Sequence, residues 1–329
     1  MNDAPLYPLR FEPIFQYRPW GGRRLASLLR APLPGSGPIG EAWLLSDRDD
    51  HPSLVADGPL AGRTIAQLIK ESPEQVMGTL AGRFSRFPLL LKFLDARDTL
   101  SVQVHPSDQQ ANYLPPGERG KTEAWVVLDA KPEDRIYAGL KPGTTAEGLR
   151  RAIANGTVPD QLASFTPQVG DAVLLEAGTV HALGGGVVFE VQENSDVTFR
   201  LYDWDRVDSR TGKLRELQVE QAIACTDFSR GAVRPVAPAV EEVKPVLRER
   251  LFTCEFFGLR RHSGSAAFTV GAAGAPRVLV CLAGEGQVEH DGAGHGFGRG
   301  DVLLLPAVVG ACPCTPSGAV TLLEVSVPE

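Results

Sequence analysis

The stretch that decides the fold is GDAVLLEA at residues 170–177, because it returns as GDVLLLPA at residues 300–307, 130 positions later. In both copies a Gly-Asp turn precedes an unbroken run of aliphatic residues, which is typical of a buried strand that begins after a tight turn. Self-similarity at a fixed offset indicates a repeated structural unit. The sequence therefore predicts two related β-rich units in one chain.

The two copies differ in the residues that come after the strand. The first continues through Gly178 to His181, whereas Ala311 stands where the second copy would place this histidine. A Gly-Asp turn, a buried strand and a Gly-x-x-His corner form the second half of a cupin-type jelly roll. We therefore expect a mainly β fold of two cupin-type jelly-roll barrels, with any metal in the first.

Helices are expected to be few and short. The 329 residues include 35 Gly and 26 Pro, a composition that favours strands and tight turns. Helical spacing of apolar residues is confined to residues 60–82, where Pro73 breaks the pattern, to 145–156, where Thr145 is a suitable N-cap, and to 217–228.

A proline-rich stretch at residues 230–246 divides the chain and is interpreted as a connection between two units. The expected domains are an N-terminal catalytic cupin domain with short helices at residues 1–232 and a degenerate C-terminal cupin domain without metal ligands at residues 233–329.

Charge and hydropathy exclude some classes of protein. The net charge of −7 provides no general positive field for nucleic acid. The longest uncharged run, residues 302–323, contains Pro306, Pro313 and Pro316, which would interrupt a membrane-spanning helix. The N-terminus shows no export signal, so we expect a cytoplasmic protein that binds neither nucleic acid nor membrane.

A strand with one polar face is predicted by the segment LSVQVHP, in which Ser101, Gln103 and His105 alternate with two valines. Glu123 begins a later apolar strand, and His181 stands at the corner after the Gly-Asp strand. Leaving so many buried polar groups unpaired would cost about 1 to 3 kcal/mol each. Two imidazoles, a carboxylate and an amide oxygen would instead suit a bound Zn²⁺.

Further charged groups are predicted on the same side. Lys121 lies two residues before Glu123, while Glu190 and Arg200 alternate with apolar residues in two later strands. Lys121 has either a pKa lowered by the nearby cation or a pairing with Glu190, and both interpretations stay open. An alternative interpretation of these polar faces is the solvent-exposed side of an antiparallel sheet.

Four segments together resemble a known family. They read FPLLLKFLDARDTLSVQVHP (87–106), GKTEAW (120–125), GTVHALGGG (178–186) and EVQENSDVTFRLYDWDR (190–206). In this order and spacing they resemble the type I mannose-6-phosphate isomerases in their short bacterial form. Trp20-Gly21-Gly22 and Gly40-Glu41-Ala42-Trp43 fit the same pattern. The resemblance covers about residues 10 to 230.

The resemblance implies specific roles for the matching residues. The implied zinc ligands are Gln103, His105, Glu123 and His181. The implied catalytic residues are Arg200, Lys121 and Glu190. The implied substrate-binding residues are Ser101, Lys92, Arg206 and Glu41. Phosphate contacts are expected from Arg200, Arg206 and Lys92, with the pair Arg23 and Arg24 either contributing or forming a solvated turn.

Two departures from the larger family members are informative. Only 57 residues separate Glu123 from His181, so no large helical insertion is expected. The larger members carry lysine where Arg206 stands and read Lys-Pro-Glu where this chain has Lys-Thr-Glu at residues 121–123.

The resemblance implies a zinc-dependent aldose-ketose isomerase of mannose metabolism, with one Zn²⁺ per chain. It would interconvert mannose 6-phosphate and fructose 6-phosphate through a cis-enediol(ate), with Glu190, a water on the metal or a histidine as the base. The alternatives are a cupin Fe(II) oxygenase, because two His and a Glu also describe such a site, and a non-catalytic sugar-binding cupin. The partner is a phosphorylated hexose, and both a monomer and a homodimer fit.

Overall fold

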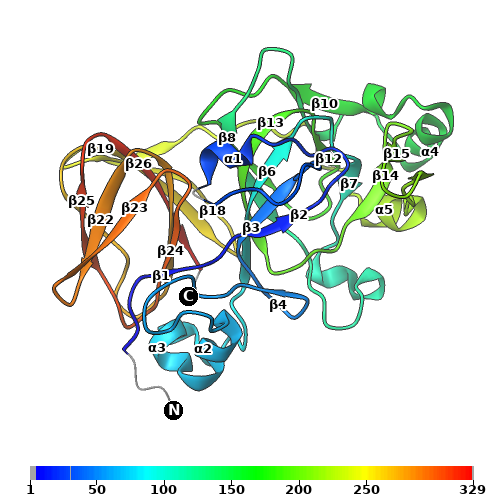
Figure 1. The fold of residues 1–329 in the computed structure, drawn as a ribbon. Coiled ribbons are helices and arrows are strands. Elements are labelled where there is room, and N and C mark those ends of the chain that lie inside the picture. Colours follow the sequence, from blue (N-terminus) through cyan, green and yellow to red (C-terminus); the bar gives the residue numbers. More distant parts are fainter. Residues whose placement is uncertain (1–4, 30, 328–329) are drawn as a thin grey trace.

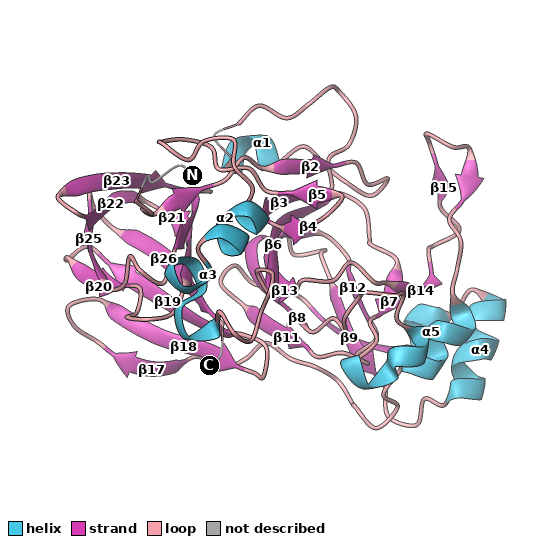
Figure 2. Ribbon diagram, turned by 90° about the horizontal axis from the view of Figure 1, so that it is seen from below, coloured by secondary structure: helices cyan, strands magenta, loops and turns pink. Residues whose placement is uncertain are grey.

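The computed structural model describes residues 5–29 and 31–327, and it consists of two β units that lie side by side (Figure 1). Each unit is built from two antiparallel sheets. Of the short helices, α4 (Ala146–Asn155) and α5 (Val219–Cys225) lie at the outer end of the first unit, as Figure 2 shows. The prediction of a mainly β, two-barrel fold with a few short helices and no large helical insertion is confirmed.

The first unit contains a six-stranded and a five-stranded sheet. The six-stranded sheet has the order β11 (Ala172–Leu175), β8 (Glu123–Asp129), β13 (Gly186–Glu193), β6 (Leu89–Ala96), β3 (Glu41–Leu45) and β2 (Ile14–Gln16). The five-stranded sheet has the order β10 (Leu162–Phe165), β9 (Ile136–Leu140), β12 (His181–Leu183), β7 (Val102–Val104) and β14 (Phe199–Tyr202). Two small hairpins, β4 (Asp47–Arg48) with β5 (His51–Pro52) and β15 (Val207–Asp208) with β16 (Lys213–Leu214), complete it.

The second unit repeats this arrangement with a seven-stranded and a four-stranded sheet. The larger sheet has the order β1 (Leu9–Arg10), β24 (Val302–Leu305), β21 (Arg277–Ala283), β26 (Val320–Ser326), β19 (Gly258–Gly264), β18 (Leu247–Thr253) and β17 (Ala239–Glu242). The smaller has the order β20 (Phe268–Val270), β25 (Cys312–Pro316), β22 (Glu285–His290) and β23 (Ala293–Gly298).

The first strand of the chain belongs to the sheet of the second unit. Leu9 pairs with Leu304 on β24, and one cluster of buried side chains extends from Leu9 and Phe93 to Phe252 and Val278. The cores of the two units are therefore continuous. The domain division at residue 232 stays a prediction, and the N-terminal strand crosses it.

Four of the described α-helices lie where the sequence signals place them. The helices are α1 (Leu25–Leu28), α2 (Ile65–Glu71), α3 (Pro73–Met77), α4 (Ala146–Asn155) and α5 (Val219–Cys225), with 3₁₀ turns η1 (Gly78–Leu80), η2 (Asp108–Tyr113) and η3 (Val158–Gln161). Thr145 Oγ1 accepts the Gly148 N–H at 3.1 Å and caps α4. Gly156 ends it with φ of 68°. Within the described residues, no helix is both long and apolar enough to span a bilayer.

Two elements were not predicted. Helix α1 has only four residues, too few for a periodic signal. Strand β17 lies within residues 230–246, which the prolines had indicated to be a plain connection. It is an edge strand of the second unit, a position that tolerates its two glutamates and the flanking prolines.

Candidate active site

Two histidines and a glutamate meet inside the first unit. His105 follows β7, Glu123 begins β8 and His181 begins β12, so three strands of two facing sheets bring them together. His105 Nε2 lies 3.2 Å from Glu123 Oε2, and His181 Nε2 lies 3.2 Å from Glu123 Oε1. All three side chains are buried. Among the described residues, these three side chains form a cluster whose ligand atoms all lie within 4.8 Å of one another and could hold a metal ion.

Backbone contacts orient both imidazoles toward the carboxylate. His105 Nδ1 lies 2.8 Å from the Val197 carbonyl oxygen, and His181 Nδ1 lies 2.8 Å from that of Thr179. Each Nδ1–H therefore donates to a carbonyl, which leaves an Nε2 lone pair directed at Glu123. Burial, followed by the charge of Lys121, lowers the pKa of His105 to about 3, so this ring is neutral.

The Nε2 atoms of both imidazoles and the carboxylate oxygens of Glu123 are all hydrogen-bond acceptors, and they face one another. Neither buried carboxylate oxygen of Glu123 meets hydrogen-bond geometry with a described residue, although the Lys121 ammonium lies 2.9 Å from Oε2 as an ion pair. Burial would raise the pKa of Glu123, but the charge of Lys121 holds that pKa well below the usual range. Two lone pairs that face an ionised carboxylate in a buried site call for a cation between them. The donor set fits a metal ion that prefers nitrogen and oxygen ligands.

Gln103 is the fourth predicted ligand, and it lies beside this group. It pairs directly with His181 across strands β7 and β12, and its Nε2 lies 3.2 Å from His181 Nε2. Rotation of the amide by half a turn exchanges its nitrogen and oxygen and would present Oε1 at the same place. Gln103 also lines a neighbouring cavity.

Lys121 makes an ion pair with Glu123, whereas the ion-pair partner of Glu190 among the described residues is Lys92. Its Nζ lies 2.9 Å from Glu123 Oε2 and 3.3 Å from His105 Nε2. Burial opposes the charged form, yet the carboxylates of Glu123 and Glu190 raise the pKa of Lys121 above its ordinary value. The protein groups alone therefore raise the pKa of Lys121, whereas a nearby bound cation was expected to lower it.

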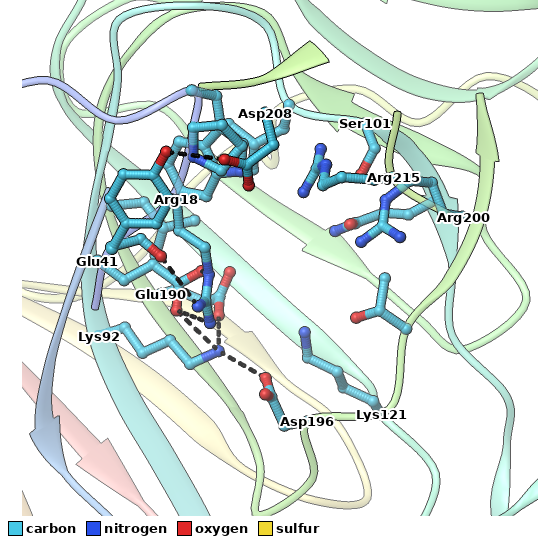
Figure 3. Close-up of a pocket in the computed structure, with 17 residues that line it drawn as sticks. Arg18, Glu41, Lys92, Ser101, Lys121, Glu190, Asp196, Arg200, Asp208 and Arg215 are labelled. Carbon is cyan, nitrogen blue, oxygen red and sulfur yellow. Dashed lines mark hydrogen bonds and ion pairs between the residues drawn. The ribbon is translucent and has the colours of Figure 1, made fainter. Parts of the chain in front are cut away.

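A cavity of about 400 Å³ is lined by Gln103 and Lys121, which contact the two histidines, while His105, Glu123 and His181 are not part of its lining. Its size is typical of sites for small molecules. Seven of the predicted residues line it: Glu41, Lys92, Ser101, Gln103, Lys121, Glu190 and Arg200. Figure 3 shows Ser101, Arg200 and Arg215 together on one side of the cavity, and Glu41, Glu190 and Lys92 on the other. The cavity therefore has an arginine-rich end and an end where acids and lysines alternate.

Glu190 is the central acid of the second end. Its Oε2 accepts the indole N–H of Trp125 at 2.8 Å, and Lys92 Nζ lies 3.3 Å from Oε1. Burial, with the charge of Glu123, raises the pKa of Glu190. Lys92 also reaches Asp196 at 3.6 Å. A carboxyl group with a raised pKa in a cavity is suited to take up and return a proton.

Glu41 faces the cavity but has its oxygens occupied. Arg18 donates to both, at 2.7 and 3.2 Å, and the Trp43 indole donates to Oε2 at 2.7 Å. Burial opposes ionisation, yet Arg18 and Lys92 lower the pKa of Glu41 to about 2. Glu41 is thus held ionised, and its strongest interactions are with the protein.

At the arginine-rich end, the guanidinium of Arg200 donates to the Glu216 carbonyl at 2.8 Å. Its buried Nε has no partner among the residues described. Burial and the neighbouring Arg215 lower the pKa of Arg200 to about 10. Burial is the larger cause, and the contribution of Arg215 shows that a second cation lies near Arg200, which favours binding of an anion.

The remaining predicted cations lie outside this cavity. Arg206 is absent from its lining; it lies 3.6 Å from Asp203 and donates to the Thr99 carbonyl. Arg24 pairs with buried Asp95 at 2.8 Å, and Arg23 donates to the Gly37 carbonyl at 2.7 Å. The latter two hold the backbone around α1.

Four charged residues of the cavity were not predicted: Arg18, Asp196, Asp208 and Arg215. Asp196 lies within a segment that carries the family resemblance, and Arg18 lies two residues before Trp20. Asp208 and Arg215 belong to the β15–β16 hairpin and its C-terminal end. None belongs to an alternating strand pattern. The available signals were the position of Arg18 near Trp20 and that of Asp196 four residues before Arg200.

Comparison with known proteins gives one consistent result. Residues 9–133 match the family described as phosphomannose isomerase type I, catalytic domain. The chain is 36% identical over 304 residues to mannose-6-phosphate isomerase ManA of Bacillus subtilis, a match that covers 92% of this chain and 94% of the relative. It is 34% identical to mannose-6-phosphate isomerase of Streptococcus mutans, with 92% and 93% coverage.

Solved structures agree with the sequence relatives. The crystal structure of mannose 6-phosphate isomerase from Bacillus subtilis superposes with a TM-score of 0.88 at 30% identity, covering 97% of this chain and 99% of the other. A variant of phosphomannose isomerase from Salmonella typhimurium superposes with a TM-score of 0.76 at 16% identity, covering 98% and 100%. The second likeness shows the fold alone.

Proposed function

The chain belongs to the type I phosphomannose isomerases, and from this premise we propose that it interconverts mannose 6-phosphate and fructose 6-phosphate with one bound Zn²⁺. The proposed ligands of the metal are the cluster of His105, Glu123 and His181 together with Gln103, which lies beside His181 and lines the cavity. Sugar phosphates are the substrates that its relatives' names give, and the cavity offers a positive end to receive one.

The single observation that carries the metal proposal is the orientation of the imidazoles. Both Nδ1–H groups are used by backbone carbonyls, so both Nε2 lone pairs face the carboxylate of Glu123. Zn²⁺ bound there would supply Lewis acidity that polarises the sugar oxygens without any redox change.

The sugar phosphate is proposed to lie along the cavity. Its phosphate would occupy the end formed by Ser101 and Arg200, and carbons 1 and 2 would lie at the end formed by Lys121 and Glu190. Bidentate guanidinium contacts suit phosphate oxygens. Lys92, which the Glu190 and Asp196 carboxylates hold at 3.3 and 3.6 Å, would bind a sugar hydroxyl between the two ends.

Isomerisation moves a proton between carbons 1 and 2, and an enediolate carries the negative charge in between. Glu190 is the proposed proton acceptor, because burial raises its pKa. Lys121 stays protonated beside Glu123 and would donate to an oxygen of the enediolate. The guanidinium of Arg200 would stabilise the same charge from the opposite side of the cavity.

A coupled assay and elemental analysis of the purified protein test this proposal together. Mannose 6-phosphate should yield fructose 6-phosphate anaerobically, with about one Zn²⁺ per chain, and chelation should abolish turnover. Iron with oxygen uptake would instead support the cupin oxygenase. Binding of mannose 6-phosphate by the zinc-loaded protein without any product would support the non-catalytic sugar-binding cupin.

A further inference from the structure

A short hairpin forms one wall of the cavity without being part of either sheet. Strands β15 and β16 pair through only two residues each, Val207 with Leu214 and Asp208 with Lys213. Figure 2 shows this hairpin standing away from the sheets, between β14 and α5. Val207 is 57% exposed and Leu214 is 62% exposed. So short a hairpin has little stability of its own, and contacts elsewhere must hold it in place.

The tip of the hairpin is held by one residue of the N-terminal segment. The Tyr17 hydroxyl lies 3.2 Å from Asp208 Oδ1 and 3.3 Å from Ser209 Oγ. The Arg210 guanidinium lies 3.3 Å from the centre of the Tyr17 ring. Tyr17 and Asp208 both line the cavity. This contact, which we call the Tyr17 latch, therefore closes the cavity between β2 and the hairpin.

The base of the hairpin is fixed by buried contacts. The Trp204 indole donates to the Leu100 carbonyl at 2.7 Å. Asp203, which is buried, accepts two hydrogen bonds from Arg215, at 2.7 and 2.5 Å. Trp204 and Asp205, which directly follow Asp203, have φ of 58° and 50°. This is a left-handed conformation that residues other than glycine seldom adopt. Because the base is fixed and the tip is held through one tyrosine, the tip can open at Tyr17 while the base stays in place.

Arg215 brings a cation from this hairpin into the cavity. Asp203 holds its Nε and one terminal nitrogen, so the second terminal nitrogen is left for the cavity that Arg215 lines. The carboxylate of Asp203 acts on Arg200, Arg206 and Arg215 together. Of these three, Arg200 and Arg215 line the cavity, and guanidinium groups suit the oxygens of a phosphate monoester.

We propose that the tip of the hairpin, residues 206–214, is a lid, which the Tyr17 latch closes over a substrate whose phosphate is bound by Arg215 at the fixed base. Opening at the latch admits the sugar phosphate, and the contact between Arg215 and phosphate stabilises the closed position. Closure excludes water from the enediolate. Because a free hexose offers no anion to Arg215, the lid selects phosphorylated sugars. This inference rests on the proposed isomerase function.

Trypsin tests the lid independently of turnover, because Arg210 and Lys213 place two cleavage sites at the tip. Tyr17→Phe removes the latch hydroxyl and should increase the rate of cleavage at these sites by about 2- to 10-fold, the equivalent of one lost hydrogen bond. Mannose 6-phosphate should slow cleavage of the wild-type protein, and mannose should not. Tyr113→Phe, at an exposed tyrosine in η2, is the matched control and should cleave like the wild type.

Kinetics test the role of Arg215. Arg215→Gln should lower kcat/KM for mannose 6-phosphate by about 10- to 100-fold, mainly through KM, since a charge-assisted contact is lost. It should also remove the protection by mannose 6-phosphate against trypsin, and Arg215→Lys should restore part of both. Arg151→Gln, at an exposed arginine of α4, is the matched control. Equal KM and equal trypsin protection in Arg215→Gln and wild type would overturn the lid while leaving the isomerase function standing. A wild-type protein that forms no fructose 6-phosphate would instead overturn the proposed function.

Discussion

The two barrels have the same strand register but carry opposite charges at equivalent positions. In the first, Leu175 on β11 lies opposite Glu123 on β8; in the second, Leu305 on β24 lies opposite Arg277 on β21. Both leucines are 1% exposed, so the two units share one packing frame. The carboxylate of one barrel is replaced by a guanidinium in the other.

A second pair of equivalent positions explains what this replacement does. Glu190 lies opposite Trp125, and Glu324 lies opposite Leu279 at the matching place in the second barrel. In the first barrel two acids share the interior with two lysines, Lys121 beside Glu123 and Lys92 beside Glu190. In the second, Glu324 has Arg277 Nε at 3.8 Å and His262 Nε2 at 3.4 Å. The first barrel differs in that two histidine Nε2 atoms converge on one carboxylate, a set of donor atoms that suits a metal ion.

Neutralising the charge at these equivalent positions should have the largest effect on zinc binding and turnover. Glu123→Gln is expected to weaken Zn²⁺ binding by at least about 100-fold, because even residues that only support metal ligands contribute 10- to 100-fold, and turnover should fall with it. Arg277→Gln should keep zinc content and kcat within about twofold. Metal analysis and the coupled assay check both variants. Equal zinc loss in the two would contradict the division of roles between the barrels.

Removing arginines should separate catalysis from structure. Arg200→Ala is expected to lower kcat/KM by about 100- to 1,000-fold, the usual range for a group that stabilises transition-state charge, while zinc content stays unchanged. In the second barrel, Arg260 on β19 pairs with Glu241 at 2.9 Å on the surface. Arg260→Ala should change the free energy of unfolding by less than about 1 kcal/mol and leave kinetics unaltered. Unchanged activity in Arg200→Ala would remove its proposed role.

The repeated leucines test whether the shared frame is equally important in both barrels. Leu175→Ala and Leu305→Ala should each lower the free energy of unfolding by about 2 to 5 kcal/mol, because each leaves a cavity in a closed core. Only the first should also weaken zinc binding, since Leu175 packs opposite Glu123. Urea unfolding and zinc titration measure the two effects. If Leu305→Ala weakened zinc binding as much as Leu175→Ala, the site would depend on both barrels.

The features that could be predicted from the sequence are those with a period or a repeat. Alternation placed Gln103 and His105 on one face, and the Gly-Asp repeat identified both barrels, because strand geometry converts these patterns directly into positions. The family resemblance then supplied roles for lysines and arginines that no pattern would distinguish. Seven of the predicted site residues, three of them lysines or arginines, line one cavity, and their individual roles remain proposals.

The features that could not be predicted depend on contacts between segments far apart in the chain. Arg215 reaches the cavity because Asp203 and the Tyr17 latch position its hairpin, and a two-residue strand gives no periodic signal. The pairing of β1 with β24 joins residues almost 300 positions apart. The direction of the Lys121 pKa was open for the same reason, since it depends on how near Glu123 and Glu190 come.

A buried acid behind the site should give the first barrel a pH-dependent stability that the second lacks. Glu193 comes three residues after Glu190, and Val327 comes three residues after Glu324. Glu193 Oε2 accepts the Thr122 N–H at 2.7 Å. Burial raises the pKa of Glu193 to about 8, against the opposing Thr122 hydrogen bond and Arg119, with Asp108 adding to the increase.

The sign of the effect is set by the protons bound in each state. Between pH 4.5 and about 8 the folded protein keeps a proton on Glu193 that the unfolded chain releases, so stability from this group falls as pH rises, by about 1 kcal/mol per pH unit. Glu193→Gln, which resembles the protonated acid, should remove this decline. Urea unfolding at pH 5, 6.5, 8 and 9 compares it with the wild type and with Glu12→Gln, an exposed control. The stability difference should grow toward pH 8 and then level off, because above that pH both folded and unfolded states have lost the proton. Parallel pH profiles would mean that Glu193 is ionised in the folded protein, and that the Thr122 N–H and Arg119 outweigh its burial.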